Sequence, residues 1–240
     1  INSLTNQTYK NIEIIFFDDK STDASVETVK KFKNVKLITN KKDKKSFGCY
    51  NQINSYKKAI KESTGDVIFF LDSDDYFKAN KVEEVINQFK FDSNCKIIFD
   101  LPTFKFKTSE IVKKNNFFFY KTYWPFIPPQ SCIAISKKYV EQVIELIDFD
   151  MFPNIWMDFR VGIVSKYIFN QFKILKKSYT YYRQSDHSIS TEYKFLSKNW
   201  WVRRMEAHNF IIYFFSKNKI KYKKNVDYSI TKLINRIYEI

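Results

Sequence analysis

Three carboxylates stand within four residues, directly after a short apolar run. The run, residues 67–71, is β-branched and aromatic and comes shortly after Gly65, which predicts a buried strand of a parallel sheet. Asp72, Asp74 and Asp75 therefore follow the carboxyl end of a strand, where open α/β sheets bind their ligands. Clustered carboxylates repel one another unless a cation or hydrogen-bond donors lie between them, and hard oxygen ligands suit Mn²⁺ or Mg²⁺.

A second apolar run ends in the same way. Residues 12–17 are followed by Asp18 and Asp19, so two predicted strands end in carboxylates, which indicates one shared cleft. A plainer interpretation stays open, because an isolated Asp-x-Asp is common. In that interpretation the acidic turn is solvated and Asp75 caps the helix that begins near Lys81.

Hydrophobic periodicity and chain breakers predict the other elements around these carboxylates. Further strands are predicted at residues 35–39, 96–100, 131–135, 172–175 and 179–183, and helices at residues 24–32, 50–62, 81–91, 137–147 and in the tail from residue 195. The clearest break in the pattern lies near Pro125.

The order and spacing of the acidic motifs resemble the nucleotide-binding half of a bacterial family 2 glycosyltransferase with the GT-A fold. The segments that carry the resemblance are residues 6–15 (NQTYKNIEII), residues 18–23 (DDKSTD) and residues 65–75 (GDVIFFLDSDD). The resemblance implies an α/β, Rossmann-like fold: a mixed, mostly parallel sheet flanked by helices, here with a helical C-terminal appendage. It also leads us to expect that the first strand of that fold is missing from this chain.

The resemblance implies a domain organisation and a role for each acidic residue. Residues 1–124 would form the nucleotide-sugar-binding half and residues 125–192 the acceptor and catalytic half of one domain, with residues 193–240 as the appendage. Asp19 would contact a uracil-type base, Asp72 the ribose and the metal, and Asp74 would be the main ligand of Mn²⁺ or Mg²⁺. Alternatively, Asp23 or Ser21 simply caps the next helix, at residues 24–32. Lys20 stands where the family usually has Gly, so we expect a different local backbone there.

The second half of the chain supplies the remaining site residues that the resemblance implies. Asp158 matches the general base of inverting members, although Met157 replaces the acidic residue that usually precedes it. The plainer interpretation of Asp158 is a helix N-cap. Arg183 and His187 lie in a segment similar to one that closes over the donor diphosphate, where Arg183 would pair with a phosphate.

Composition limits the classes of partner. The net charge of +15 suits anions such as a nucleotide diphosphate or an anionic membrane, although a compositional bias toward Lys explains it as well. No nucleic-acid-binding motif accompanies the charge, so no nucleic-acid partner is expected. Three widely spaced cysteines without a Cys-x-x-Cys motif favour a reducing cytosol over a disulfide framework or a zinc site. Basic residues interleaved with aromatic residues in the tail fit either peripheral membrane contact or helices packed on the domain.

These observations predict a glycosyltransferase that moves a sugar from a nucleotide-sugar, expected to be a UDP-sugar, to a hydroxyl of a glycan or lipid-linked glycan. The resemblance implies inversion, metal dependence and a part in bacterial surface polysaccharide or lipooligosaccharide synthesis. The expected place is the cytoplasm or the inner face of the cytoplasmic membrane. The alternative is an inactive or truncated GT-A domain that binds a nucleotide or a partner without catalysis, which the missing strand, Lys20 and Met157 favour.

Overall fold

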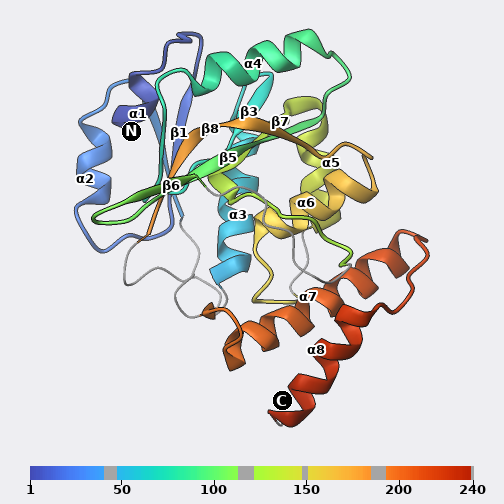
Figure 1. The fold of residues 1–240 in the computed structure, drawn as a ribbon. Coiled ribbons are helices and arrows are strands. Elements are labelled where there is room, and N and C mark those ends of the chain that lie inside the picture. Colours follow the sequence, from blue (N-terminus) through green and yellow to red (C-terminus); the bar gives the residue numbers. More distant parts are fainter. Residues whose placement is uncertain (41–47, 113–121, 148–150, 185–192, 239–240) are drawn as a thin grey trace.

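The computed structural model describes residues 1–40, 48–112, 122–147, 151–184 and 193–238, in which helices and strands alternate through most of the chain (Figure 1). The strands are β1 (Ile14–Asp18), β2 (Val35–Thr39), β3 (Val67–Phe69), β4 (Tyr76–Phe77), β5 (Ile97–Lys105), β6 (Glu110–Val112), β7 (Ile133–Ser136) and β8 (Lys173–Arg183). The helices are α1 (Asn2–Thr5), α2 (Ser25–Lys30), α3 (Gly48–Lys61), α4 (Lys81–Phe91), α5 (Lys137–Ile147), α6 (Met157–Tyr167), α7 (Lys198–Lys217) and α8 (Val226–Ile237), with the 3₁₀ turn η1 at Gln130–Cys132.

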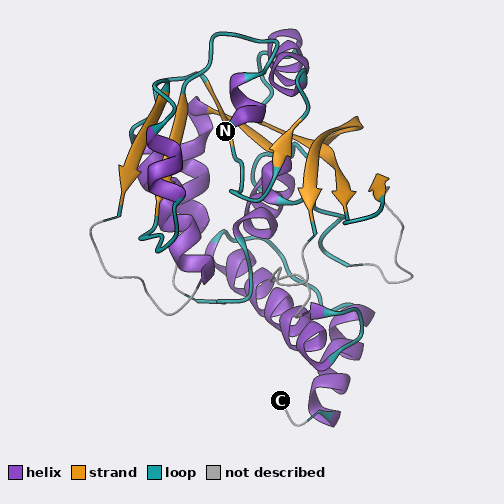
Figure 2. Cartoon of the chain, turned by 90° about the vertical axis from the view of Figure 1, so that its left-hand side faces the viewer, coloured by secondary structure: helices purple, strands orange, loops and turns teal. Residues whose placement is uncertain are grey.

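The described strands form two sheets, which appear as two groups in Figure 2. β1 and β2 pair in parallel, whereas a six-stranded sheet has the order β3-β7-β5-β8-β4, with β6 also paired to β5. The expected mixed α/β class is confirmed, but the expected predominance of parallel pairs is not found among these strands. Only β1–β2 and β5–β8 are parallel there, whereas β3–β7, β5–β7, β4–β8 and β5–β6 are antiparallel.

The central strands β5 and β7 are buried on both faces. Ile97 and Phe99 of β5 join the large core against α3, α5, α6 and α7, while Ile98 joins a smaller core beneath α4. Successive side chains of a strand point to opposite faces, so one unbroken apolar run fills both cores. The doubly buried β7 pairs with β3, so it helps to position the acidic turn that follows β3.

The chain on both sides of residue 125 contributes strands to the larger sheet, and α7 and α8 extend away from it (Figure 1). The proposed boundaries near residues 124 and 192 stay a prediction. All three cysteines are buried. In the described part of the chain, no helix combines the length and apolar character needed to cross a membrane.

Candidate functional site

The turn between β3 and β4 carries the clustered carboxylates, and a set of neutral donors holds them. Asp72 Oδ1 accepts hydrogen bonds from Tyr56 Oη of α3 (3.0 Å) and from Gln130 Nε2 of η1 (3.0 Å). The Asp72 N–H donates to Ser131 Oγ (3.0 Å). Sequence reasoning missed these three hydrogen-bond partners, although the helical spacing of α3 places Tyr56 on the same face as the buried Ile53 and Ile60.

Asp75 is buried beside Asp72 and serves the framework of the turn. Its Oδ2 accepts from Ser131 Oγ (2.6 Å) and its Oδ1 accepts from the Arg183 N–H (3.0 Å). The idea that Asp75 caps α4 is wrong, because the N-cap position of that helix is Asn80. Asp74, between the two other carboxylates, is exposed to solvent.

The two inward carboxylates hold protons more tightly than ordinary ones. Burial raises the pKa of Asp72 to about 7, and the charges of Asp75 and Asp74 add to the rise. Burial also raises the pKa of Asp75 to about 6, against the opposing hydrogen bonds from Ser131 and Arg183. Two carboxylates this close share an unfavourable negative field, which a cation would relieve.

Asp158 lies in the first turn of α6, one residue beyond the helix start. It is not the N-cap, which is Trp156, and its Oδ1 accepts from the Phe159 N–H (2.7 Å). Burial raises the pKa of Asp158, although the charge of Arg203 opposes the rise. Met157, which replaces the expected acidic residue, is fully buried in the core.

A buried arginine fixes the chain that leads into α6. The Arg160 guanidinium donates to main-chain carbonyls of Ile147, Met151, Phe152 and Ile155 at 2.8–3.0 Å. Arg160 itself is almost fully buried. It therefore ties the end of α5 to the start of α6, which positions Asp158.

The structure brings Asp158 into the same electrostatic neighbourhood as the carboxylates of the β3–β4 turn. The charge of Asp158 contributes to the raised pKa of Asp72. Tyr182, near the end of β8, responds to the same charges: burial raises its pKa, and the charges of Asp158 and Asp75 raise it further. Four carboxylates from β3–β4 and α6 thus act on one another, although more than 80 residues separate them in the sequence.

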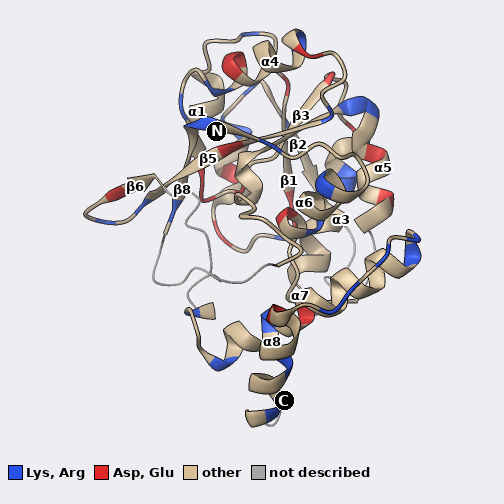
Figure 3. Cartoon of the chain, turned by 45° about the vertical axis from the view of Figure 1, so that its right-hand side comes forward, with Lys and Arg blue, Asp and Glu red and all other residues tan. Residues whose placement is uncertain are grey.

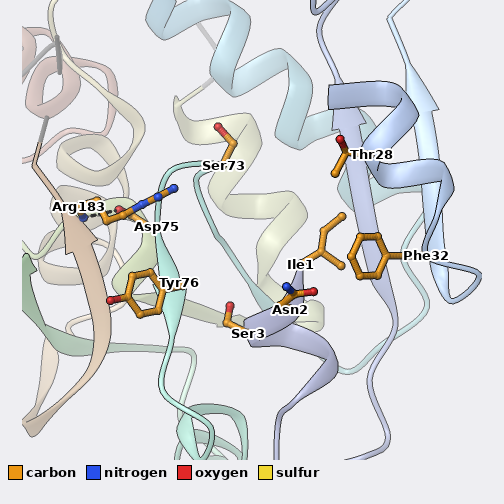
Figure 4. Close-up of a pocket in the computed structure, with 9 residues that line it drawn as sticks. All are labelled: Ile1, Asn2, Ser3, Thr28, Phe32, Ser73, Asp75, Tyr76 and Arg183. Atoms are coloured by element: carbon orange, nitrogen blue, oxygen red, sulfur yellow. Dashed lines mark hydrogen bonds between the residues drawn. The ribbon is translucent and has the colours of Figure 1, made fainter. Parts of the chain in front are cut away.

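Arg183, at the end of β8, lies against the acidic turn and lines a cavity of about 440 Å³ (Figure 4). Its Nε donates to the main-chain carbonyl of Asp74. The other lining residues are Ile1, Asn2, Ser3, Thr28, Phe32, Ser73, Asp75 and Tyr76. The cavity has the size of a small-ligand site and combines apolar rings with a guanidinium and a carboxylate. His187 lies outside the described residues.

Asp19 directly follows β1, where its Oδ1 accepts from Asn40 Nδ2 (2.6 Å) just after β2. Asn40 Oδ1 in turn accepts from Lys58 Nζ of α3 (2.9 Å). The helix α3 thus contacts both groups of carboxylates, through Lys58 near Asp19 and through Tyr56 at Asp72. The expectation of an altered backbone at Lys20 is wrong, because Lys20 takes the left-handed conformation (φ 60°) that Gly would adopt most readily.

The acidic turn fits a divalent cation. Asp72 and Asp74 offer carboxylate oxygens, and Mg²⁺ is usually held by one or two carboxylates together with substrate phosphates. Among the residues that the structure describes, no three or more His, Cys, Asp or Glu side chains gather in a way that could hold a metal alone. The donor set therefore suits a cation that is shared with a phosphate ligand.

Comparison with known proteins identifies a family and several relatives of this chain. The family described as "Glycosyl transferase family 2" matches residues 1–156. The E. coli protein named UDP-Glc:alpha-D-GlcNAc-diphosphoundecaprenol beta-1,3-glucosyltransferase WfaP is 36% identical over 104 residues, which are 43% of this chain and 39% of the relative. The E. coli protein WfgD, which carries the same activity name, is 39% identical over 89 residues, or 36% of this chain and 33% of the relative. The chain thus spans well under two thirds of these relatives.

Solved structures share the fold over most of the chain. S. aureus TarS (residues 1–349) in complex with UDP matches 100% of this chain and 67% of its own chain, with a TM-score of 0.60 and 15% identity. The complex of the same protein with UDP-GlcNAc matches 88% of this chain and 61% of its own, with a TM-score of 0.61 and 16% identity. The three-dimensional likeness therefore extends well beyond the residues that the family match covers.

Proposed function

The chain belongs to the family 2 glycosyltransferases, and we propose that it transfers a sugar from a UDP-sugar to a hydroxyl of a glycan or lipid-linked glycan. The observation that carries this proposal is the electrostatic coupling of Asp158, in the first turn of α6, to Asp72 in the β3–β4 turn, whose pKa the charge of Asp158 helps to raise. The names of the E. coli relatives support UDP as the nucleotide and a lipid-linked acceptor.

The proposed chemistry is a single displacement with inversion. Asp158 takes the proton of the acceptor hydroxyl while the hydroxyl oxygen forms a bond to the anomeric carbon of the sugar. The bond from that carbon to the phosphate oxygen breaks, and UDP leaves with the electron pair. The raised pKa of Asp158 brings its basicity closer to that needed for accepting a proton near neutral pH.

The other residues bind the donor. We assign Asp72 and Asp74 to Mn²⁺ or Mg²⁺, which when bound would neutralise negative charge on the diphosphate. Arg183 would pair with a phosphate, and the position of its guanidinium in the cavity lining beside Asp75 supports this role (Figure 4). Asp19 would accept a hydrogen bond from the uracil base, and His187 would contact the diphosphate. The proposed setting is surface polysaccharide synthesis at the cytoplasmic face of the membrane.

Thermal melting tests the donor site. The protein is melted with UDP, GDP or CDP, each with and without Mn²⁺, and the series is repeated with Asp74→Ala. We expect UDP with Mn²⁺ to raise Tm, because a ligand that binds only the folded state stabilises it, and Asp74→Ala to lose the shift. Asp66→Ala is the matched control, since Asp66 is also exposed but precedes β3 instead of following it.

Two results would count against the proposal. The absence of a nucleotide shift in the wild-type protein would contradict the donor site, and a full shift in Asp74→Ala would contradict the metal assignment. UDP release from a UDP-sugar in the presence of acceptor is then measured. Nucleotide binding without transfer would favour the alternative, a domain that binds nucleotide without catalysis.

A further inference from the structure

The last helix, α8, turns a polar face inward. Its buried residues include Asp227, Thr231 and Asn235, which are spaced four apart and so lie on one side of the helix. Asp227 Oδ1 accepts from Arg204 of α7 at 2.8 Å (Nε) and 2.7 Å (Nη2). Asn235 Nδ2 donates to the Trp201 carbonyl (3.1 Å). Polar contacts therefore hold α8 against α7.

The outward face of α8 is apolar. Val226, Leu233 and Ile237 are 66%, 59% and 71% exposed, and Ile230 is partly exposed. Their positions, i, i+4, i+7 and i+11, form one stripe along the helix, which we call the α8 stripe. Such a stripe normally faces a protein core, yet here the described part of the chain leaves it in contact with solvent. The two C-terminal helices extend away from the sheets, so the stripe is accessible to a flat partner (Figure 1).

The charges around the α8 stripe are positive. Lys232 and Arg236 are exposed on the same helix, and Lys223 and Lys224 are exposed just before it. Asp227, the acidic residue of α8, is instead buried against α7. Blue segments accordingly mark α8 and the chain that leads to it in Figure 3. A second copy of this chain would bring like charges together, whereas an anionic surface would complement them.

We propose that the α8 stripe docks on the anionic surface of a lipid bilayer. An amphipathic helix with basic residues beside its apolar face lies in the plane of the membrane interface, with the apolar side chains among the upper acyl chains. Basic residues near the surface add attraction to anionic headgroups. The inference rests on the proposed function only for the location at the membrane, and it requires no catalytic step.

Cosedimentation with vesicles tests the proposal, without donor or acceptor present. The vesicles are phosphatidylcholine alone or phosphatidylcholine mixed with phosphatidylglycerol. We expect the wild-type protein to bind the mixed vesicles and Leu233→Ser/Ile237→Ser to bind them at least about tenfold more weakly, since burial of one large apolar side chain already corresponds to such a factor. Phe91→Ser is the matched control, because Phe91 is 89% exposed on α4 and should leave vesicle binding unchanged.

A second variant tests the electrostatic contribution to vesicle binding. Lys232→Gln/Arg236→Gln should weaken binding to mixed vesicles and reduce its salt dependence, because two of the four basic residues near the stripe are then neutral. Equal binding of the Leu233→Ser/Ile237→Ser variant and the wild-type protein would overturn the proposal. So would a wild-type dimer in light scattering that this variant dissociates, since a second copy would then cover the stripe. The substituted side chains are exposed, so the Tm of each variant should equal that of the wild-type protein. The nucleotide-dependent shift in Tm reports on the donor site and so tests the proposed function separately from membrane binding.

Discussion

A buried ion pair beneath the acidic turn yields a quantitative prediction. Lys81 Nζ lies 2.9 Å from Asp100 Oδ1, and both side chains are 1% exposed. The same ammonium donates to the Ser131 carbonyl (2.6 Å) and to Thr180 Oγ1 (2.6 Å). Asp100 Oδ2 also accepts from the Tyr179 N–H (2.9 Å). The pair therefore joins α4, β5 and β8 to Ser131 of the η1 turn. The Ser131 hydroxyl in turn contacts Asp72 and Asp75.

The substitution Lys81→Met keeps most of the side-chain volume and removes the charge. Asp100 then stays buried without its counter-charge, which costs about 3–5 kcal/mol of the free energy of unfolding. That loss is a large part of the roughly 5–15 kcal/mol that stabilises a typical domain. In Lys81→Met/Asp100→Asn the remaining side chain is neutral and still offers an oxygen to the Tyr179 N–H. We therefore expect the double variant to recover about 2 kcal/mol or more relative to the single one.

Urea denaturation measures both free energies of unfolding, provided that the transitions stay cooperative and share one slope. Lys90→Met is the control, because Lys90 is exposed in the last turn of the same helix and its loss should cost under about 1 kcal/mol. A double variant no more stable than Lys81→Met would refute the reasoning, since the cost would then come from lost packing or hydrogen bonds and not from an uncompensated charge.

Two further predictions concern the acidic site itself. Asp158→Asn should abolish sugar transfer and leave the UDP-dependent melting shift intact, because an amide cannot accept the proton; transfer at the wild-type rate would rule out Asp158 as the base. The free energy of unfolding of the metal-free protein should fall as pH rises from about 4 to about 7. Over that range the folded state retains the proton of Asp72, whose pKa is raised to about 7, while the unfolded state has lost it. Asp72→Asn should show a smaller fall in pH-dependent urea unfolding, and an equal fall would assign the effect to other groups.

Local sequence patterns predict the outer elements of this fold well. The predicted bounds of β2, α4 and α5 match the structure, since each has clear periodicity and clear end signals. β8 is instead one strand, where two were expected with a break at residues 176–178. Exposed lysines interrupt the apolar pattern there, but the backbone continues to pair with β5 across an irregular register. Pairing with a distant strand leaves no local signal in the sequence.

Some residues of the candidate site can likewise be predicted from the local sequence, and others cannot. Asp72 and Asp74 are visible in the sequence because they directly follow an apolar run. The residues that hydrogen-bond to the acidic turn cannot be identified in this way. Tyr56, Gln130 and Ser131 come from elements that only the tertiary fold brings together. The helix α8 shows the same limit. Its apolar stripe alone predicts a core face, whereas the buried contacts of Asp227 with Arg204 and of Asn235 with Trp201 show that the polar side faces inward.

The supports of the acidic turn orient its carboxylates without cancelling their charge. Tyr56 and Gln130 are neutral donors to Asp72, and the charge of Lys81 is balanced by Asp100 below the turn. Burial and the neighbouring charge of Asp75 therefore raise the pKa of Asp72 to about 7. A diphosphate would add negative charge to this field, so its binding must be coupled to the uptake of protons or of a cation. Asp72 loses its proton as pH rises through about 7. Diphosphate binding that is coupled to proton uptake would then weaken. Diphosphate binding through a cation held by the ionised carboxylates would instead strengthen. Because the proposed transfer also needs Asp158 ionised to accept a proton, only cation coupling would let donor binding and catalysis improve together with rising pH.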